Sequence, residues 1–333
     1  MTKTKRSWPV QILLLISLLV CIVLAACVGK YPVSPGESLQ IMLGRTENTS
    51  EMTVNVVLGL RVPRILASVI VGGALSMSGA AYQGIFKNPL VSPDFLGVSS
   101  GACIGAAVAI LLSLSATYIS VFAFVFGIAA VLITVAIPAV MGNRSNVMLV
   151  LSGIIVGTAM SSILGFIKYI ADPNTQLASI TYWTMGSFSY ITLADLFAVL
   201  PIIVIPGIIL ILMAWWIDVL SMGEDEARTL GARVGLIRGI TIICATLLTA
   251  GSVCIAGTIS WVGLIVPHFG RMAVGPSNRK LLPMCALLGG LFMLAVDTLT
   301  RTIGTTEMPV SILTGVLGAP IFCWLLFRQR REL

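Results

Sequence analysis

Forty-nine consecutive residues, from Phe95 to Asn143, contain no Asp, Glu, Lys or Arg. A helix that crosses the hydrocarbon core of a bilayer needs about 20 apolar residues, so this interval is long enough for two crossings and must turn once. The small polar residues at 113–117 predict the position of that turn. Over the whole chain 57% of the residues are hydrophobic and only 10% are charged, which excludes a water-soluble domain with an ordinary polar surface.

Further charge-free intervals predict the other membrane spans. They cover residues 7–29, 65–86, 145–167, 196–217 and 308–327, with a shorter one at 281–296. The interval 239–270 is long for one helix, and we expect it to form two segments that turn near Gly251 to Gly257. The sequence therefore predicts an all-α, polytopic membrane protein with about ten transmembrane helices and a single domain over residues 1–333.

Basic residues predict the orientation of these helices. Lys and Arg concentrate on the cytoplasmic side of a membrane, and both ends of this chain are basic. The residues concerned are Lys3, Lys5 and Arg6 at the start and Arg328, Arg330 and Arg331 at the end. Both termini are therefore expected in the cytoplasm, which requires an even number of spans. With ten spans, 14 of the 20 basic residues lie inside.

Several kinds of site are missing from the sequence. No Gly-x-x-x-x-Gly-Lys-Ser/Thr occurs, so the chain has no P-loop to hold ATP phosphates. The seven Cys form no Cys-x-x-Cys pair and His268 is the only histidine, so neither a disulfide framework nor a metal site is expected. Leu24-Ala-Ala-Cys27 imitates a lipoprotein signal, but we interpret the first apolar segment as a retained helix.

Two other functional classes have candidate residues. Gly97-Val-Ser99-Ser-Gly101 matches the nucleophile pattern of serine hydrolases, and together with His268 it suggests an intramembrane serine protease. Small residues continue to Gly105, however, which favours close packing of two transmembrane helices. Asp297 is the best candidate for a buried carboxylate of an ion-coupled secondary transporter. Both classes stay open as alternatives.

A polar segment after Asp218 predicts a short cytoplasmic helix at about 221–231. Ser221 to Glu224 has the pattern of a capping box, and Gly231 is a typical helix stop. Glu224 precedes Arg228 by four residues, the favourable order for an ion pair. The helix is either a solvated loop element or a docking surface for a cytoplasmic partner.

Basic and helix-breaking residues mark two further places. Arg61, Arg64 and Arg301 fall on the predicted outer side, where they form either a basic surface for an acidic partner or anchors at the membrane interface. On the inner side, residues 83–94 contain two prolines, which fits a tight turn or a constriction at the mouth of a pathway.

Seven motifs, spread from residue 60 to residue 320, occur together in the chain. They are Leu60-Arg-Val-Pro-Arg64, Ser78-Gly-Ala-Ala-Tyr-Gln83, Asn88-Pro-Leu90, Leu96-Gly-Val-Ser-Ser-Gly101, Gly223-Glu-Asp-Glu-Ala-Arg-Thr-Leu-Gly231, Trp261-Val-Gly-Leu-Ile-Val-Pro-His268 and Leu317-Gly-Ala-Pro320. With them the chain resembles the permease subunits of type II ABC importers, the iron-chelate, haem and vitamin B12 uptake family.

The resemblance implies the type II importer permease fold in the plasma (inner) membrane of a prokaryote. It also implies a homodimer with the translocation path at its interface, two cytoplasmic ATP-binding subunits and an external or periplasmic solute-binding protein. ATP and Mg would be bound by the partner ATPase, so no cofactor and no catalytic residue is expected in this chain. The resemblance also implies that membrane lipid surrounds the subunit and that it binds no nucleic acid. The expected cargo is an iron–siderophore, haem or cobalamin-like chelate, and an oxyanion such as molybdate stays open.

Three sets of functional residues follow from the resemblance. The ATPase-coupling set is Glu224, Asp225, Glu226, Ala227, Arg228, Leu230 and Gly231. The binding-protein docking set is Arg61, Arg64 and Arg301. The cytoplasmic gate set is Asn88, Leu90, Ser145 and Asn146.

Overall fold

A computed structural model describes residues 7–46, 49–143, 145–303 and 307–329. Within these ranges the elements are α1 (Ser7–Cys27), α2 (Pro35–Met42), α3 (Glu51–Val54), η1 (Asn55–Arg61), α4 (Val62–Phe86), η2 (Pro93–Leu96), α5 (Val98–Leu111), α6 (Ala116–Val140), α7 (Asn146–Ile170), α8 (Gln176–Thr184), α9 (Leu193–Met222), α10 (Glu224–Thr229), α11 (Val234–Ala256), α12 (Val262–Val274), α13 (Asn278–Thr302) and α14 (Val310–Gln329). The terminal basic residues Lys3, Lys5, Arg6, Arg330 and Arg331 lie outside the described residues.

Ten helices match the ten predicted spans. Seven stretches of the described chain are long and apolar enough to cross a membrane, namely α1, the continuous run α3–η1–α4, α6, α7, α9, α11 and α13. The three shorter apolar helices are α5, α12 and α14. All ten overlap the predicted charge-free segments, which confirms the all-α polytopic architecture. The run α3–η1–α4 begins at Glu51, well before its predicted span of 65–86.

Both predicted turns occur where small residues interrupt the apolar pattern. α5 ends at Leu111 and α6 begins at Ala116, with Ser113 between them in a left-handed conformation. α11 ends before Gly257, whose φ of 69° is one that glycine adopts without strain. The long interval 239–270 therefore contributes to two helices, α11 and α12.

The predicted capping box at Ser221 is wrong. α9 continues to Met222, and the Ser221 hydroxyl donates to the carbonyl of Asp218 within that helix. Gly223 precedes α10 and provides no side-chain cap. α10 covers Glu224–Thr229 and is therefore shorter than the predicted helix at 221–231. Gly231 does follow the helix in a left-handed conformation, with φ of 80°.

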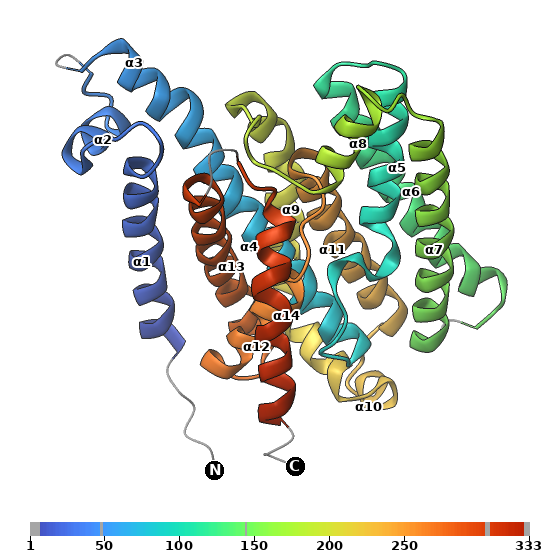
Figure 1. Cartoon of the computed structure of the whole chain (residues 1–333). Coiled ribbons are helices and arrows are strands. Elements are labelled where there is room, and N and C mark those ends of the chain that lie inside the picture. Colours follow the sequence, from blue (N-terminus) through green and yellow to red (C-terminus); the bar gives the residue numbers. More distant parts are fainter. Residues whose placement is uncertain (1–6, 47–48, 144, 304–306, 330–333) are drawn as a thin grey trace.

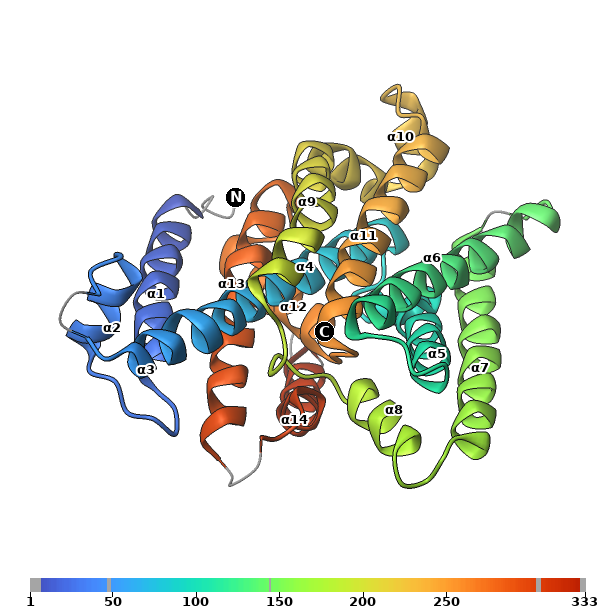
Figure 2. The same cartoon turned by 90° about the horizontal axis from the view of Figure 1, so that it is seen from above.

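The helices form a bundle with two distinct ends (Figure 1). α2, α3 and α8 lie at one end, which we call the α8 end, and α10 lies at the other, which we call the α10 end. α1 begins and α14 finishes at the α10 end. Seen from above, α4 runs through the middle of the bundle, with α1 on one side and α5, α6 and α7 on the other (Figure 2).

Glycines let the central helix α4 pack closely on its neighbours. A Cβ added to Gly72 would overlap the backbone of Gly289 in α13, and a Cβ added to Gly79 would overlap the backbone of Gly263 in α12. Small residues at helix contacts are typical of membrane bundles, because van der Waals packing drives association there. α4 is therefore the element around which α12 and α13 are positioned.

Candidate functional site

Three arginines and two carboxylates form one cluster at the α8 end, which we call the arginine cluster: Arg61, Arg64, Asp297, Arg301 and Glu307. Arg64 donates from Nε to Asp297 at 2.8 Å and pairs from Nη1 with Glu307 at 2.7 Å. Arg301 Nε lies 3.3 Å from the other Asp297 oxygen, an ion pair without hydrogen-bond geometry. The three arginines are only 6–8% exposed and Asp297 is fully buried.

Two of these arginines cap the C-terminal end of α1. Arg61 donates to the carbonyls of Ala26, Cys27 and Tyr31, and Arg301 donates to the carbonyls of Ala25 and Val28. The last carbonyls of a helix have no partner within the helix, and a cation there also complements the helix dipole. Arg61 and Arg301 therefore fix the end of α1 against α4 and α13. The three arginines lie together, but they are buried, whereas the sequence predicted a basic surface or anchors at the membrane interface.

Glu307 and Ser189 belong to the cluster although the sequence did not point to them. The Ser189 hydroxyl donates to Glu307, and Arg64 Nη1 lies 3.3 Å from the same hydroxyl. Burial acts to raise the pKa of Glu307, but hydrogen bonds from Ser189 and Arg64 and the charges of Arg64 and Arg301 outweigh it, so its pKa lies below the ordinary value. Glu307 is the exposed member of the cluster.

The helix α10 is a short, charged element at the opposite end of the molecule. Figure 2 shows it at the periphery of the bundle, beyond α11. Glu224 pairs with Arg238 of α11 and lies 4.0 Å from Arg228. Ala227 is buried and attaches the helix to the core. The exposed members of the predicted coupling set are Asp225, Glu226, Arg228, Leu230 and Gly231.

Asp218, in the last turns of α9, connects that helix to the start of α13. Its carboxylate accepts hydrogen bonds from the Ser277 hydroxyl at 2.8 Å and from the backbone and side-chain nitrogens of Asn278 at 2.6 and 2.7 Å. A carboxylate at a helix N-terminus satisfies free N–H groups and complements the dipole. Only the charge of Asp218 in an apolar stretch could have signalled this role in the sequence.

The predicted gate residues lie at the α10 end, around the end of α4 and the start of α7. The Asn88 side chain accepts from the Leu90 backbone at 2.9 Å, and both residues are exposed. The Ser145 hydroxyl caps α7 by accepting from the Met148 backbone. Asn146 donates from Nδ2 to the carbonyl of Ile85 at 3.3 Å, so the structure brings the two predicted inner loops together.

Ser99 and Asp297, on which the two rival functions depend, have structural partners. The Ser99 hydroxyl donates to Asp94, and α5 continues from Ser99 with Gly101 and Gly105 packed against the backbone of α6. Ser99 therefore lies on an ordinary helix, whereas the Gly-x-Ser-x-Gly nucleophile elbow is built on a strand-to-helix turn. Asp297 is paired with two arginines, Arg64 at one carboxylate oxygen and Arg301 at the other, so its charge is balanced within the fold.

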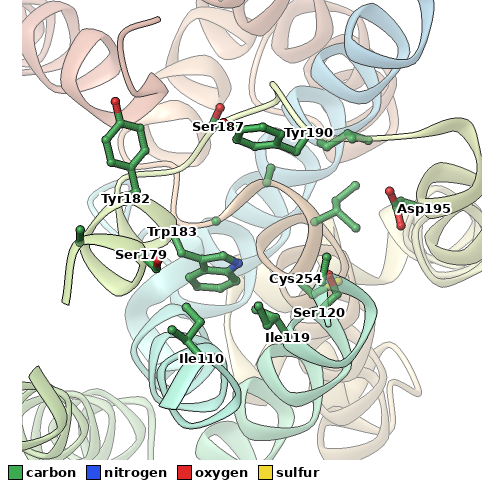
Figure 3. A pocket seen from close by; sticks show the side chains of 16 residues that line it. Ile110, Ile119, Ser120, Ser179, Tyr182, Trp183, Ser187, Tyr190, Asp195 and Cys254 are labelled. Carbon is green, nitrogen blue, oxygen red and sulfur yellow. The ribbon is translucent and has the colours of Figure 1, made fainter. Parts of the chain in front are cut away.

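A pocket of roughly 510 Å³ opens at the α8 end. Figure 3 shows side chains from four parts of the chain around it, with Ile110 of α5, Ser120 of α6, Trp183 of α8 and Cys254 of α11. This volume lies within the range of about 300–1,000 Å³ that is usual for small-molecule sites. The sequence did not reveal which segments together form the walls of this pocket, because they lie far apart in the chain.

Comparisons with known proteins agree with this architecture. The family model described as the FecCD transport family matches residues 16–328. The chain is 35% identical over 317 residues to the molybdate import system permease protein MolB of Haemophilus influenzae, which covers 94% of each chain. It is 36% identical over 321 residues to a permease protein named for an iron chelatin transport system of Helicobacter pylori, covering 94% of this chain and 97% of that one.

A solved structure has the same fold. It is described as an inward-facing conformation of an ABC transporter of the metal-chelate type, and it matches with a TM-score of 0.86 at 33% identity, over 96% of this chain and 99% of that chain. The match confirms the importer permease fold that the sequence motifs implied. Together, the family model and the two relatives show that this chain belongs to the FecCD transport family.

Proposed function

We propose that this chain is the membrane permease of an ATP-driven importer that takes up a metal chelate delivered by an external binding protein. The chain lacks a P-loop, so ATP hydrolysis belongs to a separate subunit. The observation that carries the proposal is α10, a charged helix that is attached to a membrane bundle through Ala227 and the Glu224–Arg238 ion pair and whose outer residues are exposed. Such a helix is suited to contact a soluble partner.

In this proposal the α10 end faces the cytoplasm, together with both termini. Asp225, Glu226, Arg228 and Leu230 contact the ATPase, because they are the exposed residues of α10 and of the turn after it. Glu224 and Ala227 hold the helix in place through Arg238 and the core, and Gly231 ends it. Binding of ATP by the partner favours one arrangement of the permease and hydrolysis favours another, so the path opens in turn to each side of the membrane.

We place the path at the interface of two copies of this chain, with two ATPase subunits below them. Polar groups on the outer face of α7 support this arrangement. Thr158, Ser161 and Ser162 are exposed near the middle of a 25-residue apolar helix. Their hydroxyl-bearing face is better suited to a solvated path than to lipid. Asn88, Leu90, Ser145 and Asn146 then close the cytoplasmic mouth of that path.

The arginine cluster is the proposed docking region for the binding protein. Arg61 and Arg301 donate hydrogen bonds to carbonyls at the end of α1, so they support the docking region from inside the protein. Arg64 is the arginine in direct contact with the exposed Glu307, through its Nη1. An acidic side chain of the binding protein would replace Glu307 on Arg64.

The cargo is proposed as an iron–siderophore, haem or cobalamin-like chelate. Support comes from the relative named for iron chelatin transport and from the solved structure of the metal-chelate type. The relative named for molybdate import makes an oxyanion the competing proposal.

The test is ATPase activity of the chain in lipid vesicles with its candidate ATPase subunit. We expect co-purification, and we expect Leu230→Glu in the turn after α10 to abolish it or to uncouple the activity from the binding protein. Leu43→Glu is the matched control, since Leu43 is an exposed leucine at the α8 end, and it should leave the activity unchanged. Wild-type chain that binds no ATPase would overturn the proposal.

A further inference from the structure

Gln83, in the last turn of α4, is a buried polar residue that belongs to neither the gate set nor the coupling set. It is only 4% exposed. Its amide nitrogen donates to the carbonyl of Val91 at 3.1 Å and to the carbonyl of Leu264 at 3.4 Å, and its amide oxygen accepts from the guanidinium of Arg271. One side chain therefore connects the loop after α4 to both ends of α12.

The partners of the Gln83 amide determine its orientation. A guanidinium can only donate hydrogen bonds and a backbone carbonyl can only accept them, so the amide oxygen faces Arg271 and the nitrogen faces Val91. Rotating the amide by half a turn would place its oxygen against two carbonyl oxygens and its nitrogen against a cation. Within the described residues no carboxylate forms an ion pair with Arg271. Arg271 therefore holds Gln83 in the orientation in which it can donate to Val91.

The loop that Gln83 contacts carries two of the proposed gate residues. We call residues 87–92 the gate loop, and it contains the exposed residues Asn88 and Leu90. Hydrogen bonds within the loop give it its shape, because the Leu90 backbone donates to the Asn88 side chain and the Val91 backbone donates to the Asn88 carbonyl. Val91 itself is buried. Its carbonyl is the point at which Gln83 holds the gate loop.

A second contact attaches the same stretch of chain to α12. A Cβ added to Gly263 would overlap the ring of Pro93, the residue that begins η2. The carbonyl of Gly263 in turn lies against Gly79 of α4, one turn before Gln83. α12 therefore supports the gate loop at Val91 through the Gln83 amide and just beyond the loop through Pro93.

We propose that Gln83 and Arg271 are positioning residues of the cytoplasmic gate. Arg271 orients the Gln83 amide, and the amide holds the gate loop, so that Asn88 and Leu90 keep their place at the mouth of the path. The inference rests on the proposed function, which makes these two residues part of a gate, and deepens it by naming what holds them. α12 is then the helix that supports this half of the gate.

One substitution separates the two roles of Gln83. In Gln83→Glu the side chain keeps an acceptor for Arg271, whose charge favours the ionised carboxylate, but it has no N–H to donate to Val91. If Gln83 served only as the partner of Arg271, this variant would behave as the wild type. If Gln83 positions the gate loop, the Val91 carbonyl loses its donor and the loop opens more often.

The test is hydrogen–deuterium exchange of the purified full chain in lipid nanodiscs, followed by mass spectrometry of peptides that cover the gate loop. Loss of one buried hydrogen bond should raise the population of the open loop, and with it the exchange rate of the Leu90 and Val91 amides, about tenfold. We expect this acceleration in Gln83→Glu, confined to the gate loop. Arg271→Leu should accelerate exchange about threefold, because the amide then rotates but keeps its N–H groups.

Gln11→Glu is the matched control. Gln11 of α1 also donates from its side-chain nitrogen to a backbone carbonyl, that of Lys280 at 3.2 Å, near the α10 end of the molecule. The same change of charge and the same loss of a hydrogen bond at this distant site should leave exchange of the gate loop within about twofold of the wild type.

Wild-type exchange of the gate loop in Gln83→Glu would overturn the inference, and so would equal acceleration in Gln11→Glu or acceleration spread over the whole chain. The assay contains no ATPase and no binding protein. A chain that binds no ATPase would therefore defeat the proposed function without changing this result. Unchanged exchange in Gln83→Glu would defeat the inference and leave the importer assignment intact.

Discussion

The Nε–H of Arg64 donates a 2.8 Å hydrogen bond to the carboxylate of Asp297, although 233 residues separate them in the sequence. Both residues are buried within a membrane bundle, where an unpaired charge is costly. Their pairing joins α4 to α13, and Arg301 completes the neutralisation from one turn further along α13. Because Asp297 is held in these ion pairs, we interpret it as a structural residue and not as the carboxylate of an ion-coupled transporter.

We expect Asp297→Asn to destabilise the protein strongly. The substitution leaves Arg64 and Arg301 without their buried counter-charge, and breaking a buried pair in this way costs about 3–5 kcal/mol. The free energy of unfolding, measured by detergent-induced unfolding of the purified chain, checks this. Glu307→Gln is the comparison, because it breaks a partly exposed pair and should cost at most about 1 kcal/mol. Equal losses for the two variants would contradict the assignment.

Gly79→Ala should disturb the crossing of α4 and α12. The added methyl would overlap the carbonyl of Gly263, and overpacking of this kind costs about 1–3 kcal/mol. Gly239→Ala in α11 is the control, because nothing lies within 4 Å of its added Cβ, and alanine there should be neutral or stabilising by up to about 1 kcal/mol. Thermal unfolding of both variants distinguishes steric overlap from a general effect of replacing glycine.

Most of the fold could be predicted from the sequence, because the membrane dictates it. Charge-free intervals fix where helices cross, and interruptions at Ser113 and Gly257 fix where they turn. The burial of Arg61, Arg64 and Arg301 could not be predicted, since their partners are backbone carbonyls of α1 and carboxylates far along the chain. The Ser221 capping box failed for a local reason, as the α9 helix continues through that residue and uses its hydroxyl.

The pairing of Glu307 predicts a pH dependence. Because its pKa is lower in the folded protein than its ordinary value, the pairing stabilises the fold above the unfolded-state pKa of about 4.3. This contribution is lost as the pH falls through the folded-state pKa. The stability difference between wild type and Glu307→Gln should therefore be constant from about pH 7 to about pH 5 and shrink below about pH 4. A difference that grows on acidification would show that the sign is wrong.

Glu307→Gln should also strengthen docking of the binding protein. In the proposed docking region, Glu307 occupies the Arg64 nitrogen that an incoming carboxylate would take. Removing its charge frees that nitrogen, and a partly exposed ion pair limits the gain in affinity to about fivefold. Surface plasmon resonance with the permease in nanodiscs measures it.

Glu51→Gln is the matched control for docking, because Glu51 begins α3 at the same end of the molecule and its replacement changes the net charge equally. An equal gain for both variants would mean that the binding protein responds to overall charge and not to Arg64. A loss of affinity in Glu307→Gln would mean that Glu307 holds Arg64 in the orientation that the partner recognises, so exchange of the two carboxylates would no longer describe how docking occurs.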